Sequence, residues 1–130
     1  YAHHPTEVAA TVEAARSVTS GRVWVVFQPH RFTRTAGLAP AFGGPLSHAD
    51  RVVVTDIYSA GEQPQPGVTG RLVAEAVRAG GGDVEYVDRL ADVPERIAHE
   101  LSAGDTLILM GAGDVATIWT DIGDLIGDES

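Results

Sequence analysis

The chain has 130 residues and a formal net charge of −9 at pH 7. This length is enough for one domain with one hydrophobic core. The excess of acidic residues and the lack of a basic stripe argue against a surface for nucleic acid or for an anionic membrane. Cys is absent, which excludes disulfides and thiolate metal ligands and suits a reducing compartment. No segment of the sequence indicates a membrane span or a signal peptide, so we expect a cytoplasmic protein.

Four apolar runs predict strands, at Val23–Phe27, Val52–Thr55, Val84–Val87 and Thr106–Met110. Each run is continuous rather than alternating, which is typical of strands buried on both faces of a parallel sheet. The segments beside the runs place apolar residues every three or four positions, and this spacing predicts helices. The expected buried faces are Val8, Val12 and Ala15 in the first helix, Leu72, Val73, Ala76 and Val77 in the third, and Ile97, Ala98 and Leu101 in the fourth.

The second predicted helix, from Ala36 to Leu46, has the weakest pattern because Pro40, Gly43 and Gly44 interrupt it. A last helix follows the last strand. The alternation of helix and strand predicts an α/β fold: a Rossmann-like open, mainly parallel sheet with helices on both faces. Such domains usually begin with a strand, whereas the pattern here begins with a helix. We therefore expect a first strand upstream of Tyr1, missing from this fragment of a longer protein.

Polar residues gather in four turns: Tyr1–Thr6, Gln28–Thr35, Asp56–Glu62 and Gly111–Asp114. Three of them follow predicted strands, and the first follows the strand expected upstream. In an open α/β sheet such turns lie along the carboxyl edge, where these folds bind their ligands. We therefore expect the functional residues at this edge.

The turn after the first predicted strand carries His30, Arg31 and Arg34. If a helix starts here, the two guanidiniums project side by side and can hold one anion. Because the chain as a whole is acidic, this cationic cluster is a local exception. The alternative is that both Arg side chains form ion pairs with surface carboxylates.

His3 and His4 precede the first helix, whose free amides and dipole favour an anion. The alternative is that one His caps the helix and the other packs. Adjacent His residues do not easily ligate one metal ion, and no third ligand is evident, so no metal site is predicted. His48 and His99 belong to no motif and are expected on the surface.

Asp56 and Glu62 flank a turn of small residues, where they could bind an amine or orient an Arg. The alternative for Asp56 is that it caps its own loop. Gly111 and Gly113 form a short glycine turn before a helix, a weak signal for phosphate binding. The chain contains no Lys and therefore no phosphate-binding P-loop, so any main triphosphate site lies outside it.

Together the four turns resemble the C-terminal domain of the UDP-N-acetylmuramate:L-alanine ligases, in the Mur ligase family. The resemblance spans essentially the whole chain, and its most specific stretch is Phe27–Thr35. The related ligase that recycles murein peptides shares the His-His-Pro turn but typically replaces the Pro-His-Arg stretch. It remains one alternative, and a non-catalytic α/β module that binds a small anionic ligand is the other.

The resemblance implies a bacterial enzyme of three domains, of which residues 1–130 form one. The N-terminal domain binds the UDP-sugar, the central domain binds ATP and Mg²⁺, and the C-terminal domain closes over the cleft. ATP phosphorylates the muramoyl carboxylate, the alanine amine attacks the acyl phosphate, and phosphate leaves.

The resemblance also implies residue roles. The catalytic set that it implies is His3, His30, Arg31 and Arg34, with the two Arg meeting carboxylate or phosphate charge. The cofactor-facing set is Tyr1, His4, Asp56, Glu62, Gly111 and Gly113, in which Asp56 and Glu62 chiefly shape the site. No cofactor is expected to bind tightly to this chain alone.

Overall fold

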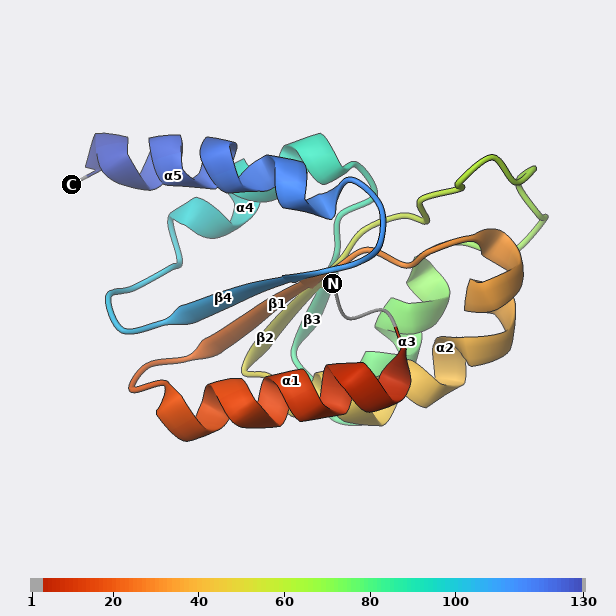
Figure 1. The fold of residues 1–130 in the computed structure, drawn as a ribbon, viewed down its shortest axis with the longest axis horizontal. Coiled ribbons are helices and arrows are strands. Elements are labelled where there is room, and N and C mark those ends of the chain that lie inside the picture. The colour runs from red at the N-terminus through yellow and green to blue at the C-terminus, as the bar shows by residue number, and fades with distance from the viewer. Residues whose placement is uncertain (1–3, 130) are drawn as a thin grey trace.

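A computed structural model of the chain describes residues 4–129, with side chains described as far as residue 125. Four parallel strands lie between two layers of helices (Figure 1). The strands are β1 (Val23–Phe27), β2 (Arg51–Val54), β3 (Val84–Tyr86) and β4 (Thr106–Met110). One face of the sheet is covered by α1 (Pro5–Val18), α2 (Phe32–Ser47) and α3 (Arg71–Ala79), and the other by α4 (Val93–Ala98) and α5 (Ile118–Glu129). None of these helices, within residues 4–129, is long and apolar enough to cross a membrane.

The predicted α/β fold with helices on both faces of a parallel sheet is confirmed. The strand order is β3-β2-β1-β4, and every pairing is parallel. The chain therefore steps outward from β1 to β3 and then returns to place β4 on the other side of β1. The connections after β1 and β4 consequently lead to opposite layers of helices. Ligands of open α/β sheets bind at such a reversal of strand order.

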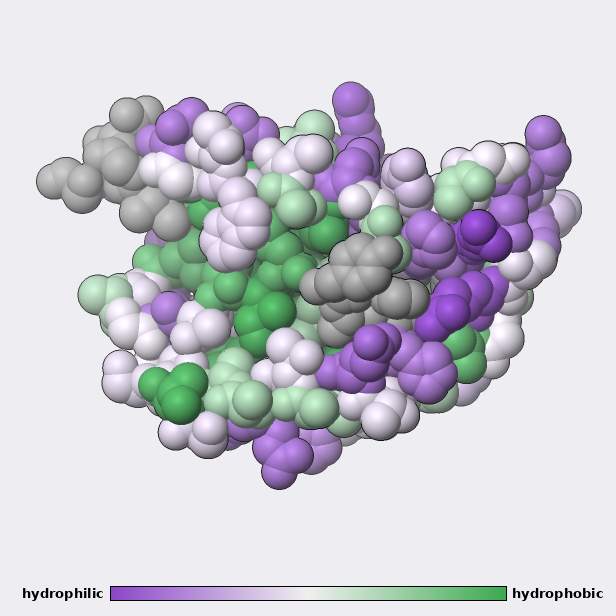
Figure 2. All heavy atoms as spheres, in the orientation of Figure 1, coloured by the Kyte–Doolittle hydropathy of each residue, from purple (hydrophilic) through white to green (hydrophobic). Residues whose placement is uncertain are grey.

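The prediction that all four strands are buried on both faces is correct for β1 and wrong for the outer strands. All five residues of β1 are buried, whereas the three residues of β3 are half-buried. In β4 only Leu109 and Met110 are buried, and Figure 2 shows a hydrophobic surface over β4 between α5 and α1. The reason is that β3 and β4 each pair with one neighbour only among the described strands. The strand expected before Tyr1 lies outside the described residues.

The hydrophobic core has two halves, one on each face of the sheet, and β1 contributes to both. Val25 and Phe27 pack against α1, α2 and α3, and the ring of Phe27 lies 4.7 Å from that of Phe42. Trp24 and Val26 pack against α4 and α5. Burying side chains of this size contributes about 1.5–3 kcal/mol each, which fixes β1 and the turn that follows it.

Two helices differ in extent from their predictions. The second was predicted from Ala36 to Leu46, but α2 runs from Phe32 to Ser47 with Pro40 inside it. The fourth helix, α4, ends at Ala98, before Leu101, although the Leu101 amide still donates to the Ile97 carbonyl at 3.1 Å.

Gly43 explains why a glycine stands inside α2. A Cβ atom at this position would lie 2.5 Å from the carbonyl oxygen of Ala76 in α3. Gly43 thus permits the close contact of α2 with α3, although glycine lowers helix propensity. At Gly37, which is exposed in the same helix, a Cβ atom would meet nothing within 4 Å.

These two glycines of α2 give a matched pair of predictions. Gly37→Ala should raise the free energy of unfolding by about 0.5–1 kcal/mol, because Gly37 is exposed and Ala is the better helix former. Gly43→Ala should lower it by about 1–3 kcal/mol, because the new methyl group overlaps α3. Urea unfolding of the two variants measures both changes. Equal stabilisation by both variants would contradict the close contact.

Candidate functional site

Tyr58 joins three strand-end turns at the carboxyl edge of the sheet. Its amide donates to the Pro29 carbonyl at 2.9 Å, and its carbonyl accepts from the Arg31 amide at 2.8 Å. Its ring stacks on the imidazole of His30, with centroids 5.8 Å apart and planes 25° apart. The same ring covers Gly113 so closely that a Cβ atom there would overlap it. The turns after β1, β2 and β4 therefore form one unit.

Gln28 connects the turns after β1 and β4 directly, at the reversal of strand order. Its side chain is almost fully buried, and Nε2 donates to Asp114 Oδ1 at 2.6 Å. Its Oε1 is buried and has no hydrogen-bond partner among residues 4–125. Neither Gln28 nor Tyr58 was predicted from the sequence to have a role of its own. Gln28 could have been noticed in the sequence, because it is a polar residue directly after the apolar run of the central strand.

Arg31 is the residue immediately before α2, and its backbone is strained. Its φ of 66° and ψ of 147° are rarely adopted by a residue other than Gly. The Arg31 amide is held by Tyr58, and its carbonyl accepts from the Thr35 amide at 3.1 Å and the Thr35 hydroxyl at 2.7 Å. The side chain is exposed, and Figure 2 shows hydrophilic side chains gathered over the start of α2.

Arg34 lies in the first turn of α2 and is half-buried, as is His30 before it. The helix begins at Phe32, so Arg34 lies in its first turn while Arg31 stands just before it in a non-helical conformation. That the two guanidiniums meet the same anion stays a prediction.

Glu62 caps α2 from the loop between β2 and α3. Its Oε1 accepts from the amides of Phe32 at 2.6 Å and Thr33 at 3.2 Å, and its Oε2 accepts from the Thr33 hydroxyl at 2.6 Å. The hydrogen bond from the Thr33 side chain, supported by the two amides, holds the pKa of Glu62 below its usual value. Because the amides at the start of a helix have no partner within it, this cap explains why α2 begins at Phe32.

Asp56 caps its own loop, which was the alternative predicted for it from the sequence. Its Oδ1 accepts from the Ile57 amide at 2.8 Å and from the Gly70 amide at 3.1 Å, which ties the loop to the start of α3. Tyr86 lies near the Asp56 carboxylate, and the guanidinium of Arg71 lies 4.7 Å from the centre of the Tyr86 ring. Burial, with the charge of Asp56, raises the pKa of Tyr86 from 10.0 to about 12.

The raised pKa of Tyr86 predicts a loss of stability at high pH. A group with a raised pKa contributes its stability fully below the pKa of the unfolded chain, which is 10.0 here, and loses it as the pH rises to about 12. The free energy of unfolding should therefore fall across this range in the wild type and fall less in Tyr86→Phe. Urea unfolding across this pH range measures the difference. Identical pH profiles would show that Tyr86 titrates normally.

His4 caps α1, as its alternative stated: Nδ1 accepts from the Thr6 amide at 3.4 Å. Tyr1 and His3 lie outside the described residues. Gly111 has a φ of 157°, which other residues rarely adopt, and a Cβ atom there would lie 3.1 Å from the Gln28 carbonyl oxygen, so both its backbone and close packing account for this glycine. In the described part of the chain no group of three His, Cys, Asp or Glu residues could hold a metal ion.

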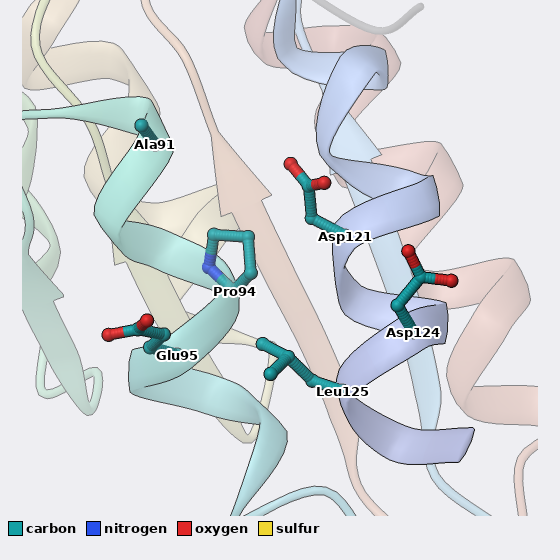
Figure 3. Close-up of a pocket in the computed structure, with 6 residues that line it drawn as sticks. All are labelled: Ala91, Pro94, Glu95, Asp121, Asp124 and Leu125. Carbon is teal, nitrogen blue, oxygen red and sulfur yellow. The ribbon is translucent and has the colours of Figure 1, made fainter. Parts of the chain in front are cut away.

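A separate hollow lies between α4 and α5, in the helical layer (Figure 3). It is lined by Ala91, Pro94, Glu95, Asp121, Asp124 and Leu125. Asp121 and Leu125 extend from α5 toward α4. None of the predicted site residues lines this hollow, so the carboxyl edge of the sheet remains the candidate site.

A model of the family described as "Mur ligase, glutamate ligase domain" matches residues 1–113. The chain belongs to this family. It is 55% identical over 120 residues to the UDP-N-acetylmuramate–L-alanine ligase of Cutibacterium acnes, covering 91% of this chain and 26% of that protein. It is 50% identical over 125 residues to the ligase of the same name from Mycolicibacterium smegmatis, covering 94% and 25%. The chain thus spans about a quarter of the length of these curated relatives.

Solved structures agree with this membership at the level of the fold. The structure of the UDP-N-acetylmuramate-alanine ligase MurC of Thermotoga maritima matches with a TM-score of 0.79 at 24% identity. The match covers the whole of this chain and 26% of the Thermotoga chain. The structure of a murein peptide ligase of Psychrobacter arcticus matches with a TM-score of 0.76 at 21% identity, over 98% of this chain and 26% of the Psychrobacter chain. The resemblance inferred from the four turns is therefore confirmed.

Proposed function

We propose that residues 1–130 are the C-terminal domain of an ATP-dependent ligase that joins L-alanine to UDP-N-acetylmuramate in peptidoglycan precursor synthesis. The observation that carries this proposal is the identity of about half over nearly the whole chain with relatives of that name. It is supported by the site, where the cationic turn after β1 is built into a unit of three strand-end turns. We further propose that the parent enzyme acts in the cytoplasm and that its other domains close against this edge.

In the proposed reaction Arg31 and Arg34 neutralise carboxylate or phosphate charge beside the reacting group. A guanidinium suits this role because it donates in a planar fork to two oxygens and keeps its charge. His30 lies beside them, held by the ring of Tyr58 at 5.8 Å. Gly111 and Gly113 let the turn after β4 approach closely, and Tyr1, His3 and His4 belong to the turn that we propose to face the nucleotide.

The residues present do not fit a resident ATP–Mg²⁺ site. The chain has no Lys for a phosphate-binding loop, and the described part of it has no cluster of metal ligands. The two candidate carboxylates, Asp56 and Glu62, are engaged by amides of the chain itself. We therefore propose that ATP and Mg²⁺ are bound mainly by another part of the parent enzyme.

The test is phosphate release by the full-length parent protein with ATP, Mg²⁺, UDP-N-acetylmuramate and an amine substrate. L-alanine should support release, whereas the tripeptide L-alanyl-γ-D-glutamyl-meso-diaminopimelate should not. Preference for the tripeptide would instead establish the recycling activity. Residues 1–130 alone should release no phosphate, and ligation by them would overturn the proposed division of roles.

A further inference from the structure

The start of α2 has no capping side chain of its own. The residue before the helix is Arg31, whose side chain cannot accept a hydrogen bond and makes no cap. An uncapped start leaves the first amides of a helix without partners. Here the partner is Glu62, which is about thirty positions away in the sequence and satisfies the amides of Phe32 and Thr33.

The loop that carries Glu62 is itself fixed in shape. Ala60 and Gly61 both have positive φ, at 51° and 89°, and the Glu62 amide donates to the Ser59 carbonyl at 3.0 Å. Earlier in the same loop, Tyr58 pairs with the backbone on the N-terminal side of α2. The loop therefore holds Arg31 from both sides, through Tyr58 before it and through Glu62 after it.

A strained residue keeps its conformation only where its surroundings over-determine it. Arg31 is such a residue, and the hydrogen bonds of Tyr58 and Glu62 are the contacts that flank it. Glu62 also places a carboxylate at the positive end of the α2 dipole. This end of the helix is therefore already occupied, and an anionic reactant is left to the guanidiniums.

We propose that Glu62 is a positioning residue, which caps α2 from another loop and thereby holds Arg31 in the backbone conformation needed to meet an anionic reactant. Glu62 acts through Arg31 and does not touch the reactant. The expected effect of Glu62 on the reaction rate rests on the proposed function. The cap itself is independent of that function and can be measured separately.

The kinetic test uses the full-length parent ligase. Glu62→Ala should lower kcat/KM at least tenfold, whereas Glu62→Gln, which keeps an oxygen acceptor for the two amides, should stay within about threefold of the wild type. Glu75→Ala is the matched control, because Glu75 is an exposed acid on α3, and it should leave kcat/KM unchanged. Equal losses in the Ala and Gln variants would overturn the capping role.

A double-mutant cycle tests whether Glu62 acts through Arg31. If it does, Arg31→Ala combined with Glu62→Ala is no slower than Arg31→Ala alone. Multiplied losses would show that Glu62 acts on its own, and the proposal would fail.

Amide hydrogen exchange in the same protein separates the cap from the ligase reaction. The amides of Phe32 and Thr33 should exchange at least tenfold faster in Glu62→Ala than in the wild type. Unchanged exchange would refute the cap whatever the activity. If exchange accelerates but the wild type shows no ligation of L-alanine, the proposed function fails and the cap stands.

Discussion

Arg31→Ala and Arg34→Ala, each made in the full-length parent enzyme, should lower kcat/KM at least tenfold while leaving the melting temperature nearly unchanged. Losing a charge-assisted hydrogen bond to an anion costs about 1.5–3 kcal/mol, which corresponds to tenfold or more in rate. A solvated surface ion pair is worth about 1 kcal/mol or less. Arg31 gives the cleaner measurement because its side chain is exposed.

The control is Arg78→Ala, which removes an exposed guanidinium from the last turn of α3. It should leave both the kinetics and the melting temperature unchanged. Arg31→Lys should give an intermediate loss, because an ammonium keeps the charge but not the planar fork. Wild-type kinetics in both Ala variants would show that the two guanidiniums are solvated and that the candidate site is wrong.

The strands could be predicted because their signal is local. A strand that contacts helices on both faces needs a continuous apolar run, and Val23–Phe27 is such a run. The first residue of α2, and the reason why this helix contains Gly43, could not be predicted, because the residues responsible are distant in the sequence. Its cap comes from Glu62, which lies in a distant loop. Gly43 is needed because a carbonyl of α3 lies close to it, and the sequence of α2 does not show this contact.

The grouping of the turns was predictable for a topological reason. Parallel strands end at one edge of a sheet, so the residues that follow them meet there. The contacts within that group were not predictable, because a pattern does not show which loops cross. Tyr58 pairs with the turn after β1, and Gln28 reaches Asp114 after β4. By contrast, the caps formed by His4 and Asp56 involve near neighbours in the sequence, and each had been given as an alternative.

Of the substitutions considered for their effect on stability, Asp105→Ala should produce the largest loss, at least about 3 kcal/mol in the free energy of unfolding. The Asp105 side chain is 5% exposed, and its carboxylate accepts from the amides of Arg22 at 2.8 Å and Ser102 at 3.0 Å. It also accepts from the indole nitrogen of Trp24 at 3.1 Å, in a ring that is itself buried. Each hydrogen bond to a charged group contributes about 1.5–3 kcal/mol, and the variant leaves three donors without this acceptor.

The matched control for this loss is Asp83→Ala. Asp83 also pairs with an arginine, Arg51 at 3.2 Å, but its side chain is 65% exposed. Its removal should cost about 1 kcal/mol or less. Urea unfolding at neutral pH measures both variants, and equal losses would show that burial of the Asp105 carboxylate does not set its contribution.

The contribution of Asp105 should also depend on pH, in a direction that its pKa determines. Burial alone would raise the pKa of Asp105, but the hydrogen bonds from Arg22, Ser102 and Trp24 outweigh burial and hold it below the usual 3.8. A lowered pKa contributes stability that is complete above the unfolded value and is lost as the pH falls through the folded value. The stability difference between the wild type and Asp105→Asn should therefore be constant near neutrality and shrink below pH 3.8. A difference that persists unchanged in acid would show that the carboxylate charge does not strengthen these hydrogen bonds.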